Sequence, residues 1–384
     1  MHQIYLDYAA ATPVHKQVLL AMQPYQTERF FNPSSPYASA VEVRRDYEDA
    51  KARLAATFGA RGDEIVITSG ATESINLACA AGNGHIVSDS IEHPAVLEAV
   101  KRSDTHTLVT PTEKGMVTPE AVQAALRPDT WLVSVQLANN EIGTIQPLRA
   151  IAQVIAAERQ ARAEQGNTAP LFLHSDASQG FGHIDVHVAR LGVDMLTLNS
   201  GKTYGPKGVG LLWAKPGVAL KPLIVGGGQE RGLRSGTENV PGVIGFAMAA
   251  ELAVKKQKSE QARLTSLRDM LQKKLQLAFP EMVVSGHVKK RLPGHLHIAF
   301  PAIDGERIIY LLERDGICVA TGSACAANKG TRSHVLEAIG LPPEVADGSL
   351  RITLGHYTTE QHIYDTAEAI TAAIKSEYTR METQ

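Results

Sequence analysis

The chain has 384 residues, of which 44% are hydrophobic, and its formal net charge at pH 7 is -2. This length allows two or three compact units of about 100 to 200 residues, each with a buried core. A net charge so close to zero gives no electrostatic reason to expect direct binding of nucleic acid or of an anionic membrane. The three cysteines form neither a disulfide framework nor a CxxC zinc site, so each thiol needs its own explanation.

The N-terminus and the most apolar stretch argue against export and membrane insertion. The first residues lack a basic segment followed by a continuous apolar one, so no secretory signal is expected. The stretch 240–254 is interrupted by Glu251 and is shorter than the ~20 residues that a membrane span needs. We therefore expect a cytoplasmic protein that does not bind a membrane.

In chain order, the first expected element is a short extended segment that ends near Pro13. A helix over 14–22 and a loop at 32–36 follow, and apolar residues at helical spacing predict an amphipathic helix over 38–58. Apolar strands then alternate with helices, which is typical of an α/β fold with a largely parallel sheet. We expect these strands at 64–68, 85–88, 107–109, 130–136, 170–174 and 195–198.

A long helical segment, 241–277, carries leucines on one face and charged residues elsewhere, and we expect it to lead into a smaller domain. The expected division is a large domain over 14–250 and a small α+β domain made of 1–13 and 251–384. In the C-terminal part we expect strands at 296–300, 317–320 and 350–353, and helices at 306–314, 333–339 and 359–379.

Lys202 follows an apolar segment, 194–198, and precedes a turn rich in glycine and proline. Burial at the end of a strand lowers the pKa of a lysine and leaves an amine able to form a Schiff base with a carbonyl or with pyridoxal phosphate (PLP). Alone, the motif is more simply a surface lysine in a turn. A second apolar segment, however, ends in Asp176, and a PLP enzyme needs such an acid to keep the pyridine nitrogen protonated.

With these two segments placed, the sequence resembles the cysteine desulfurases, PLP enzymes of the class V aminotransferase family. The resemblance implies PLP-dependent transferase fold type I, with a mainly parallel sheet in the large domain and a smaller α+β C-terminal domain. It runs nearly end to end and rests on ordered motifs with compatible spacing. These motifs are Tyr5 to Pro13, Thr68 to Ser74, Glu92 to Pro94, Asn139 to Gly143, His174 to Gln179, Lys202 to Gly208, Arg234 to Thr237 and Gly322 to Cys325.

The segment 69–74 is expected to open a helix, which places backbone N–H groups and the Thr72 hydroxyl where an anion binds well. A threonine cap beside a glycine turn is the simpler explanation of this motif alone. The resemblance implies that Ala71 and Thr72 bind the PLP phosphate. It also implies that Thr237 reaches the phosphate of the other subunit of a homodimer.

The resemblance further assigns residues to the cofactor ring. His93 would stack on the pyridine and assist proton transfer, Asp176 would hold the pyridine nitrogen, and Lys202 would carry PLP and later move the Cα proton. Asn140 would lie near the ring oxygen and the substrate, and Gln179 would be a second ligand of that oxygen. Capping or turn chemistry remains the alternative for the histidine and the two amides.

Arg351 lies between apolar residues of an expected strand, where a guanidinium without an anionic partner would be costly. The carboxylate of the substrate L-cysteine and a structural salt bridge are equally plausible partners.

Cys325 lies in a small, polar segment in which Lys329 and Arg332 would favour the thiolate. The resemblance implies that Cys325 takes the sulfur of L-cysteine as a persulfide and leaves L-alanine. Cys79 and Cys318 have apolar neighbours and are expected to be buried and inert. No metal site is expected beyond a possible transient iron–sulfur ligand at Cys325.

The segment that follows Cys325 resembles that of the long-loop subgroup, which passes the persulfide to an iron–sulfur scaffold or another sulfur acceptor, for cluster assembly or tRNA thiolation. The expected function is therefore that of a homodimeric cysteine desulfurase. The alternatives are a selenocysteine lyase or aminotransferase of the same fold, and a weakly active sulfur-relay protein.

Two departures from the family pattern stand out. The family has Ser-x-His-Lys where this chain has Asn199-Ser-Gly201-Lys202, so we expect Asn199 and Gly201 to contribute to an altered phosphate site. The sequence 330–333 also differs from the usual one, which leaves the identity of the acceptor open.

Overall fold

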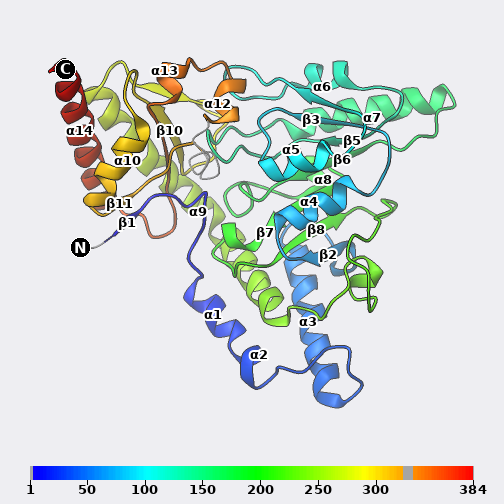
Figure 1. The fold of residues 1–384 in the computed structure, drawn as a ribbon. Coiled ribbons are helices and arrows are strands. Elements are labelled where there is room, and N and C mark those ends of the chain that lie inside the picture. Colours follow the sequence, from blue (N-terminus) through cyan, green and yellow to red (C-terminus); the bar gives the residue numbers. More distant parts are fainter. Residues whose placement is uncertain (1–2, 323–331, 384) are drawn as a thin grey trace.

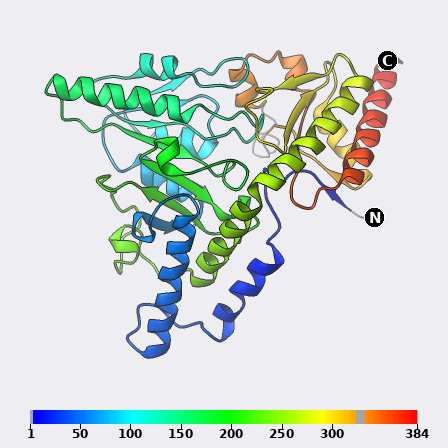
Figure 2. The ribbon, with the colours of Figure 1, turned by 180° about the vertical axis from the view of Figure 1, so that it is seen from behind.

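Figure 1 shows the computed structural model, which describes residues 3–322 and 332–383. A larger part is built on a seven-stranded sheet and a smaller part on a three-stranded sheet. Helix α9, Val240–Ala278, runs from the larger part into the smaller one, as Figure 2 shows from behind. Among the described residues, no helix is long and apolar enough to cross a bilayer, and no group of three or more His, Cys, Asp or Glu side chains could hold a metal ion.

The large sheet is parallel except for one strand. Its strand order is β2-β8-β7-β6-β5-β3-β4, and β8 runs antiparallel to both of its neighbours. Because parallel strands end at the same edge, their C-terminal residues meet there. In sheet order the strands are Ile65–Thr68, Gly210–Ala214, Met195–Asn199, Phe172–Asp176, Thr130–Ser134, His85–Asp89 and His106–Val109.

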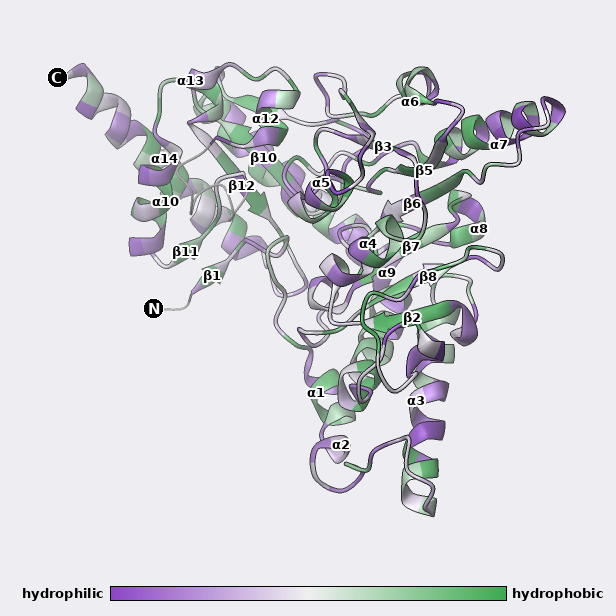
Figure 3. Ribbon diagram, turned by 45° about the vertical axis from the view of Figure 1, so that its right-hand side comes forward, coloured by the Kyte–Doolittle hydropathy of each residue, from purple (hydrophilic) through white to green (hydrophobic). Residues whose placement is uncertain are grey.

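Both faces of this sheet are buried, which explains why its strands are apolar without alternation. In β2, Ile65 and Ile67 join the core under one set of helices, and Val66 joins the core on the opposite face. Figure 3 shows these hydrophobic strands in the centre and hydrophilic stretches on helices such as α3 and α14. The first face packs on α3 (Ala38–Ala56), α7 (Leu148–Glu164) and the start of α9. The second face packs on α4 (Ala71–Cys79) and α5 (Pro94–Val100).

Shorter helices complete the larger part. Helix α1 packs on α9 and is followed directly by α2. Three 3-10 turns, η1 to η3, are also present, of which η2 leads out of β7. The helices are α1 (Lys16–Met22), α2 (Pro24–Thr27), α6 (Pro119–Ala125) and α8 (Val188–Leu191). The turns are η1 (Gly62–Glu64), η2 (Ser200–Lys202) and η3 (Glu230–Gly232).

The smaller part contains both ends of the chain. Strand β10, His295–Ala299, lies between β9, Val283–Ser285, and β12, Ser349–Thr353, and all pairs are antiparallel. Strand β1, Ile4–Tyr5, pairs in parallel with β11, Ile317–Cys318, which attaches the N-terminus to this part. The helices here are α10, Gly305–Arg314, α12, His334–Ala338, α13, Pro343–Ala346, and α14, Glu360–Glu382.

The expected fold class is confirmed: the chain is α/β with a mainly parallel sheet. The strands expected before residue 200 are present within a few residues of their expected ends, and the segment 241–277 forms one continuous helix. Strand β8 was not expected. Cys79 is buried as expected, and burial raises the pKa of its thiol to about 12. The expectation for Cys318 is wrong, because this residue is only half-buried and its Sγ accepts a hydrogen bond from Gln3 Nε2 at 3.0 Å.

Candidate active site

Two adjoining cavities, of about 320 and 290 Å³, open at the carboxyl ends of β6 and β7. The structure gathers most of the residues expected from the sequence around them. Those that line the first are Ala71, Thr72, His93, Asn140, Asp176, Gln179, Asn199, Lys202 and Arg351. The second is lined by residues 69–73 together with Asn199, Gly201, Lys202 and Lys207.

Lys202 lies where strand β7 gives way to the turn η2. Asn199 caps this turn, because its Oδ1 accepts a hydrogen bond from Gly201 N at 3.1 Å. The Lys202 ammonium donates to the backbone carbonyls of Ala9 and Ala10, at 2.8 and 2.7 Å. The N-terminal segment therefore holds the amine at the junction of the two cavities.

Asp176 is the last residue of β6 and lies in the wall of the first cavity. Its Oδ1 accepts from Ser178 N at 2.9 Å, and a carboxylate has further acceptor positions for an N–H donor in the cavity. Gln179 lies nearby and donates from Nε2 to Ala9 O at 3.0 Å. The carboxylate and Lys202 thus share one cavity.

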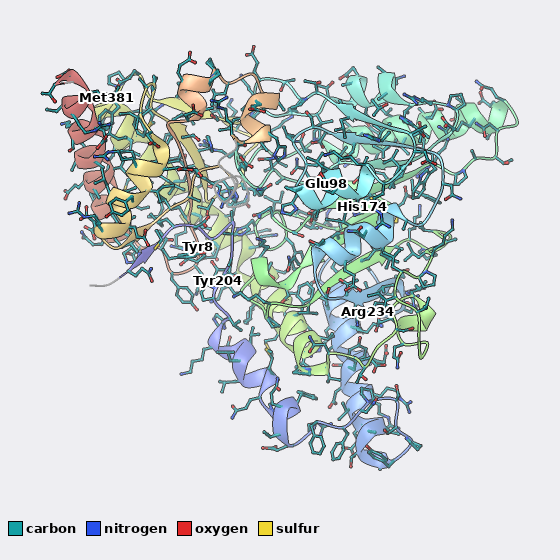
Figure 4. All side chains as sticks on the ribbon, in the orientation of Figure 1. Tyr8, Glu98, His174, Tyr204, Arg234 and Met381 are labelled. Carbon is teal, nitrogen blue, oxygen red and sulfur yellow. The ribbon has the colours of Figure 1, made fainter. Side chains whose placement is uncertain are left out.

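His174 precedes Asp176 by two residues but has a structural role. Figure 4 labels His174 on the large sheet, where it belongs to β6. Its Nδ1 lies 2.9 Å from Ser134 Oγ and its Nε2 lies 2.9 Å from Thr197 Oγ1. Burial lowers the pKa of His174 to about 4, so this ring is neutral at neutral pH. It links β6 to both neighbouring strands.

His93 caps α5 at the rim of the first cavity. Its Nδ1 accepts a hydrogen bond from Ala95 N at 3.1 Å, so the neutral ring carries its proton on Nε2. Loss of solvent lowers the pKa of His93, against the opposite influence of Asp176. The neighbouring Glu92 is buried, and burial raises the pKa of its carboxyl well above the usual range.

Arg351 lies on β12 and projects its guanidinium between the N-terminal segment and the first cavity. Its Nη2 donates to Asp7 Oδ1 at 2.7 Å and its Nη1 to Asn140 O at 3.3 Å. Of the two partners considered for Arg351, the structural carboxylate is therefore present. Its buried Nε has no hydrogen-bond partner among the described residues, so this donor is left for a ligand.

The second cavity lies against the start of α4. The first N–H groups of a helix have no intrahelical partner and suit an anion. Glu73 is also at this end, but it accepts from Ser69 N at 2.8 Å and pairs with Arg234 Nε at 2.9 Å. Thr237 is exposed and lines neither cavity of its own chain.

Sequence reasoning missed several groups at the site. The carbonyls of Ala9 and Ala10 reach Lys202 only through the fold, since they are distant in the chain. Gln136 lines the first cavity and Lys207 the second. A polar residue at the C-terminal end of the strand expected at 130–136 was a usable signal for Gln136. Lys207 was read only as part of a turn.

The residues present fit PLP. An acid, a lysine and an accessible histidine surround the first cavity, and the adjoining one ends at a helix N-terminus. Arg351 Nε, a buried polar group without a hydrogen-bond partner among the described residues, supplies a donor for a substrate carboxylate beside the position of the PLP ring. Cys325 lies outside the described residues.

The aminotransferase class-V family pattern matches residues 4–365. Cysteine desulfurase IscS 1 of Archaeoglobus fulgidus is 42% identical over 382 residues, covering 97% of each chain. A solved NifS-like protein has a TM-score of 0.89 at 33% identity, covering 97% of this chain and 100% of its own. SspA in complex with cysteine has a TM-score of 0.77 at 33% identity, covering 93% and 100%. The chain therefore belongs to the aminotransferase class-V family and, within it, to the PLP-dependent cysteine desulfurases.

Proposed function

We propose that this protein converts L-cysteine to L-alanine and that Cys325 receives the sulfur as a persulfide. The observation that carries this proposal is the placement of Lys202 and Asp176 around one cavity, with an arginine donor beside it. The names of the similar proteins favour this function over those of a selenocysteine lyase or an aminotransferase.

The described residues that flank the segment with Cys325, Gly322 and Ser333, both lie beside Glu141. Ser333 Oγ donates to Glu141 Oε2 at 2.5 Å, and Gly322 packs closely against the same carboxyl. Glu141 directly follows Asn140, which lines the cavity. This placement supports a Cys325 that works at the substrate.

Bound PLP supplies an electron sink that stabilises negative charge on the amino-acid carbon atoms. With PLP in this cavity, Asp176 would accept the pyridine N–H and Lys202 Nζ would hold the cofactor covalently. The carbonyls of Ala9 and Ala10 orient the Lys202 amine, which later moves the Cα proton of the substrate. His93, kept neutral, exchanges a proton at Nε2.

In the sulfur-transfer step, the Cys325 thiolate forms an S–S bond to the substrate sulfur while the substrate C–S bond breaks. The bonding electron pair of the C–S bond remains with the carbon skeleton, which then takes up protons to give alanine. Thiol and L-cysteine are consumed, and persulfide and L-alanine are formed, so that no outside oxidant or reductant is needed.

Arg351 Nε and Asn140 are proposed to bind the substrate, with the guanidinium on its carboxylate. Arginine suits this role because its planar donors match a carboxylate. Asn140 and Gln179 are proposed to hold the ring oxygen of PLP.

The phosphate is proposed to bind at Ala71 and Thr72, with Asn199 and Gly201 beside it and Thr237 from a second copy of the chain. The exposed position of Thr237 supports a site completed by another subunit. Exposed apolar residues of the preceding segment, including Val225 at 78%, support a homodimer interface there.

Further proposals concern organisation and partners. Separate apolar cores support the division into 14–250 and 1–13 with 251–384. The resemblance of the sequence after Cys325 to the long-loop subgroup supports a protein acceptor of the persulfide, such as an iron–sulfur scaffold, and transient iron–sulfur ligation by Cys325 stays part of that proposal. We place the protein in the cytoplasm.

The test compares Cys325→Ser with Cys79→Ser in a single turnover with L-cysteine. Cys325→Ser should still bind PLP but release no alanine and carry no persulfide, whereas Cys79→Ser should behave as the wild type. Persulfide found by mass spectrometry on Cys79 or Cys318 would contradict the assignment of the thiol. A requirement for a keto acid would indicate an aminotransferase instead.

A further inference from the structure

Lys207 lies at the phosphate end of the site, in the turn that follows η2. It lines the second cavity together with Thr72, Asn199 and Gly201, and its side chain is exposed in the single chain. We propose that the Lys207 ammonium binds the phosphate of PLP and supplies the positive charge of that site. This inference rests on the proposed function, in which the phosphate lies at the start of α4.

The charge of Lys207 is available to an anion. Its Nζ donates to Thr12 O at 2.5 Å, and an ammonium has two further donors. Glu73, the one acid among the described residues that line this cavity, is engaged by Arg234. Lys202, the other cation there, serves the cofactor ring in the proposed mechanism. A phosphate at this end therefore meets Lys207 as its cation.

The geometry at Gly201 links Lys207 to the missing histidine of the family pattern. A Cβ on Gly201 would lie 3.7 Å from Lys207 Cγ and 3.5 Å from Asn199 Oδ1. The aliphatic part of Lys207 therefore runs beside the position from which a side chain at 201 would extend. An ammonium there can replace the charge that an imidazole would contribute.

A purely structural lysine would give a different result in a binding experiment. Lys207 touches Thr12, whose hydroxyl donates to Gly201 O at 3.1 Å and accepts from Tyr204 N at 2.8 Å. If Lys207 only held this segment in place, its removal would disturb the ring and phosphate ends alike. A cofactor analogue without a phosphate separates the two roles.

The experiment titrates the full-length apoprotein with PLP and, separately, with pyridoxal, and follows absorbance to obtain each Kd. Lys207→Met keeps the length of the stem and removes the charge, Lys207→Arg keeps the charge, and Lys375→Met is the control at an exposed lysine of α14 that lines neither cavity. Lys207→Met should weaken PLP binding about 10- to 100-fold, the worth of a hydrogen bond to a charged group. Its pyridoxal affinity should not change, and Lys207→Arg should retain most of the PLP affinity.

An unchanged PLP affinity in Lys207→Met would overturn the inference. An equal loss for PLP and pyridoxal would also overturn it, because it would show a structural lysine. If the wild type itself did not bind PLP, both the proposed function and this inference would be rejected. If the wild type and Lys207→Met both bound PLP normally, only the role of Lys207 would be rejected.

Discussion

The guanidinium of Arg351 already has a carboxylate partner, Asp7, in a site proposed to receive the carboxylate of an amino acid. Their side chains are 3% and 17% exposed, and the closest N–O distance is 2.7 Å. Asp7 compensates the buried charge when no substrate is present, and Nε stays available. A substrate carboxylate would therefore bind beside the existing ion pair of Arg351 and Asp7. Because Asp7 already compensates the guanidinium charge, the carboxylate adds less to the affinity for the substrate.

Asp7→Asn should destabilise the protein by about 3 kcal/mol, because it leaves a buried guanidinium without its anion. Urea unfolding measures this loss. Added L-alanine should raise the stability of the variant more than that of the wild type, because its carboxylate replaces the lost charge.

Asp46→Asn is the matched control. Asp46 pairs with Arg29 at the surface, where an ion pair is worth about 1 kcal/mol or less. Equal losses in the two variants, or no extra effect of L-alanine on Asp7→Asn, would contradict the description of Arg351.

At the scale of single residues, the sequence was sufficient to predict that Lys202 and Asp176 lie where strands end. Each of them follows an apolar segment whose end could be recognised. The sequence was insufficient to predict the contacts of Asp7 and Lys207. Their partners, Arg351 and Thr12, are far away in the chain, and only the tertiary structure brings them close.

Among the elements, α4 and β8 approach each other closely at the phosphate end. A Cβ on Gly210, the first residue of β8, would lie 2.7 Å from Gly70 Cα and 2.8 Å from Leu198 O. Gly70 directly precedes α4. The absence of a side chain at Gly210 therefore lets the start of α4 lie close to β8.

Gly210→Ala should cost about 1 to 3 kcal/mol of stability through overpacking and should weaken PLP binding, because the start of α4 must shift. Gly201→Ala is the control for stability alone, because its new Cβ would make only ordinary contacts of 3.5 and 3.7 Å. Urea unfolding of both variants and PLP titration of Gly210→Ala test this. Wild-type PLP affinity in Gly210→Ala would be inconsistent with a phosphate bound at α4.

Strand β8 is among the elements that the sequence did not predict. It follows a turn rich in glycine and proline, and Gly210 at its start weakens the strand pattern. The parallel strands were easier to predict because burial on both faces makes each a continuous apolar run.

For the whole molecule, the site is assembled from distant parts of the chain. The segment with Ala9 and Ala10 and the strand with Arg351 come from opposite ends of the sequence. A small apolar cluster containing Ile91, Ile142 and Val335 joins the larger and smaller parts close to the cavity. Sequence patterns predicted the two parts, but not how they meet.

Val225→Asp should convert the proposed homodimer into a monomer that retains PLP poorly, because it places a charge in the apolar segment before Thr237. Val288→Asp, at a residue 66% exposed in the smaller part, should remain dimeric. Sedimentation and dialysis of both variants measure the outcome. A fully active wild-type monomer at assay concentration would refute the shared site.

The central claim is that Lys202 carries PLP in the cavity that also contains Asp176. The most direct measurement is borohydride reduction of the PLP-loaded protein, followed by peptide mass spectrometry. We predict one reduced PLP adduct, on Lys202, and none in Lys202→Ala, which should also form no alanine from L-cysteine. An adduct on Lys207 or another lysine of the wild type, or alanine formation by Lys202→Ala, would contradict the claim.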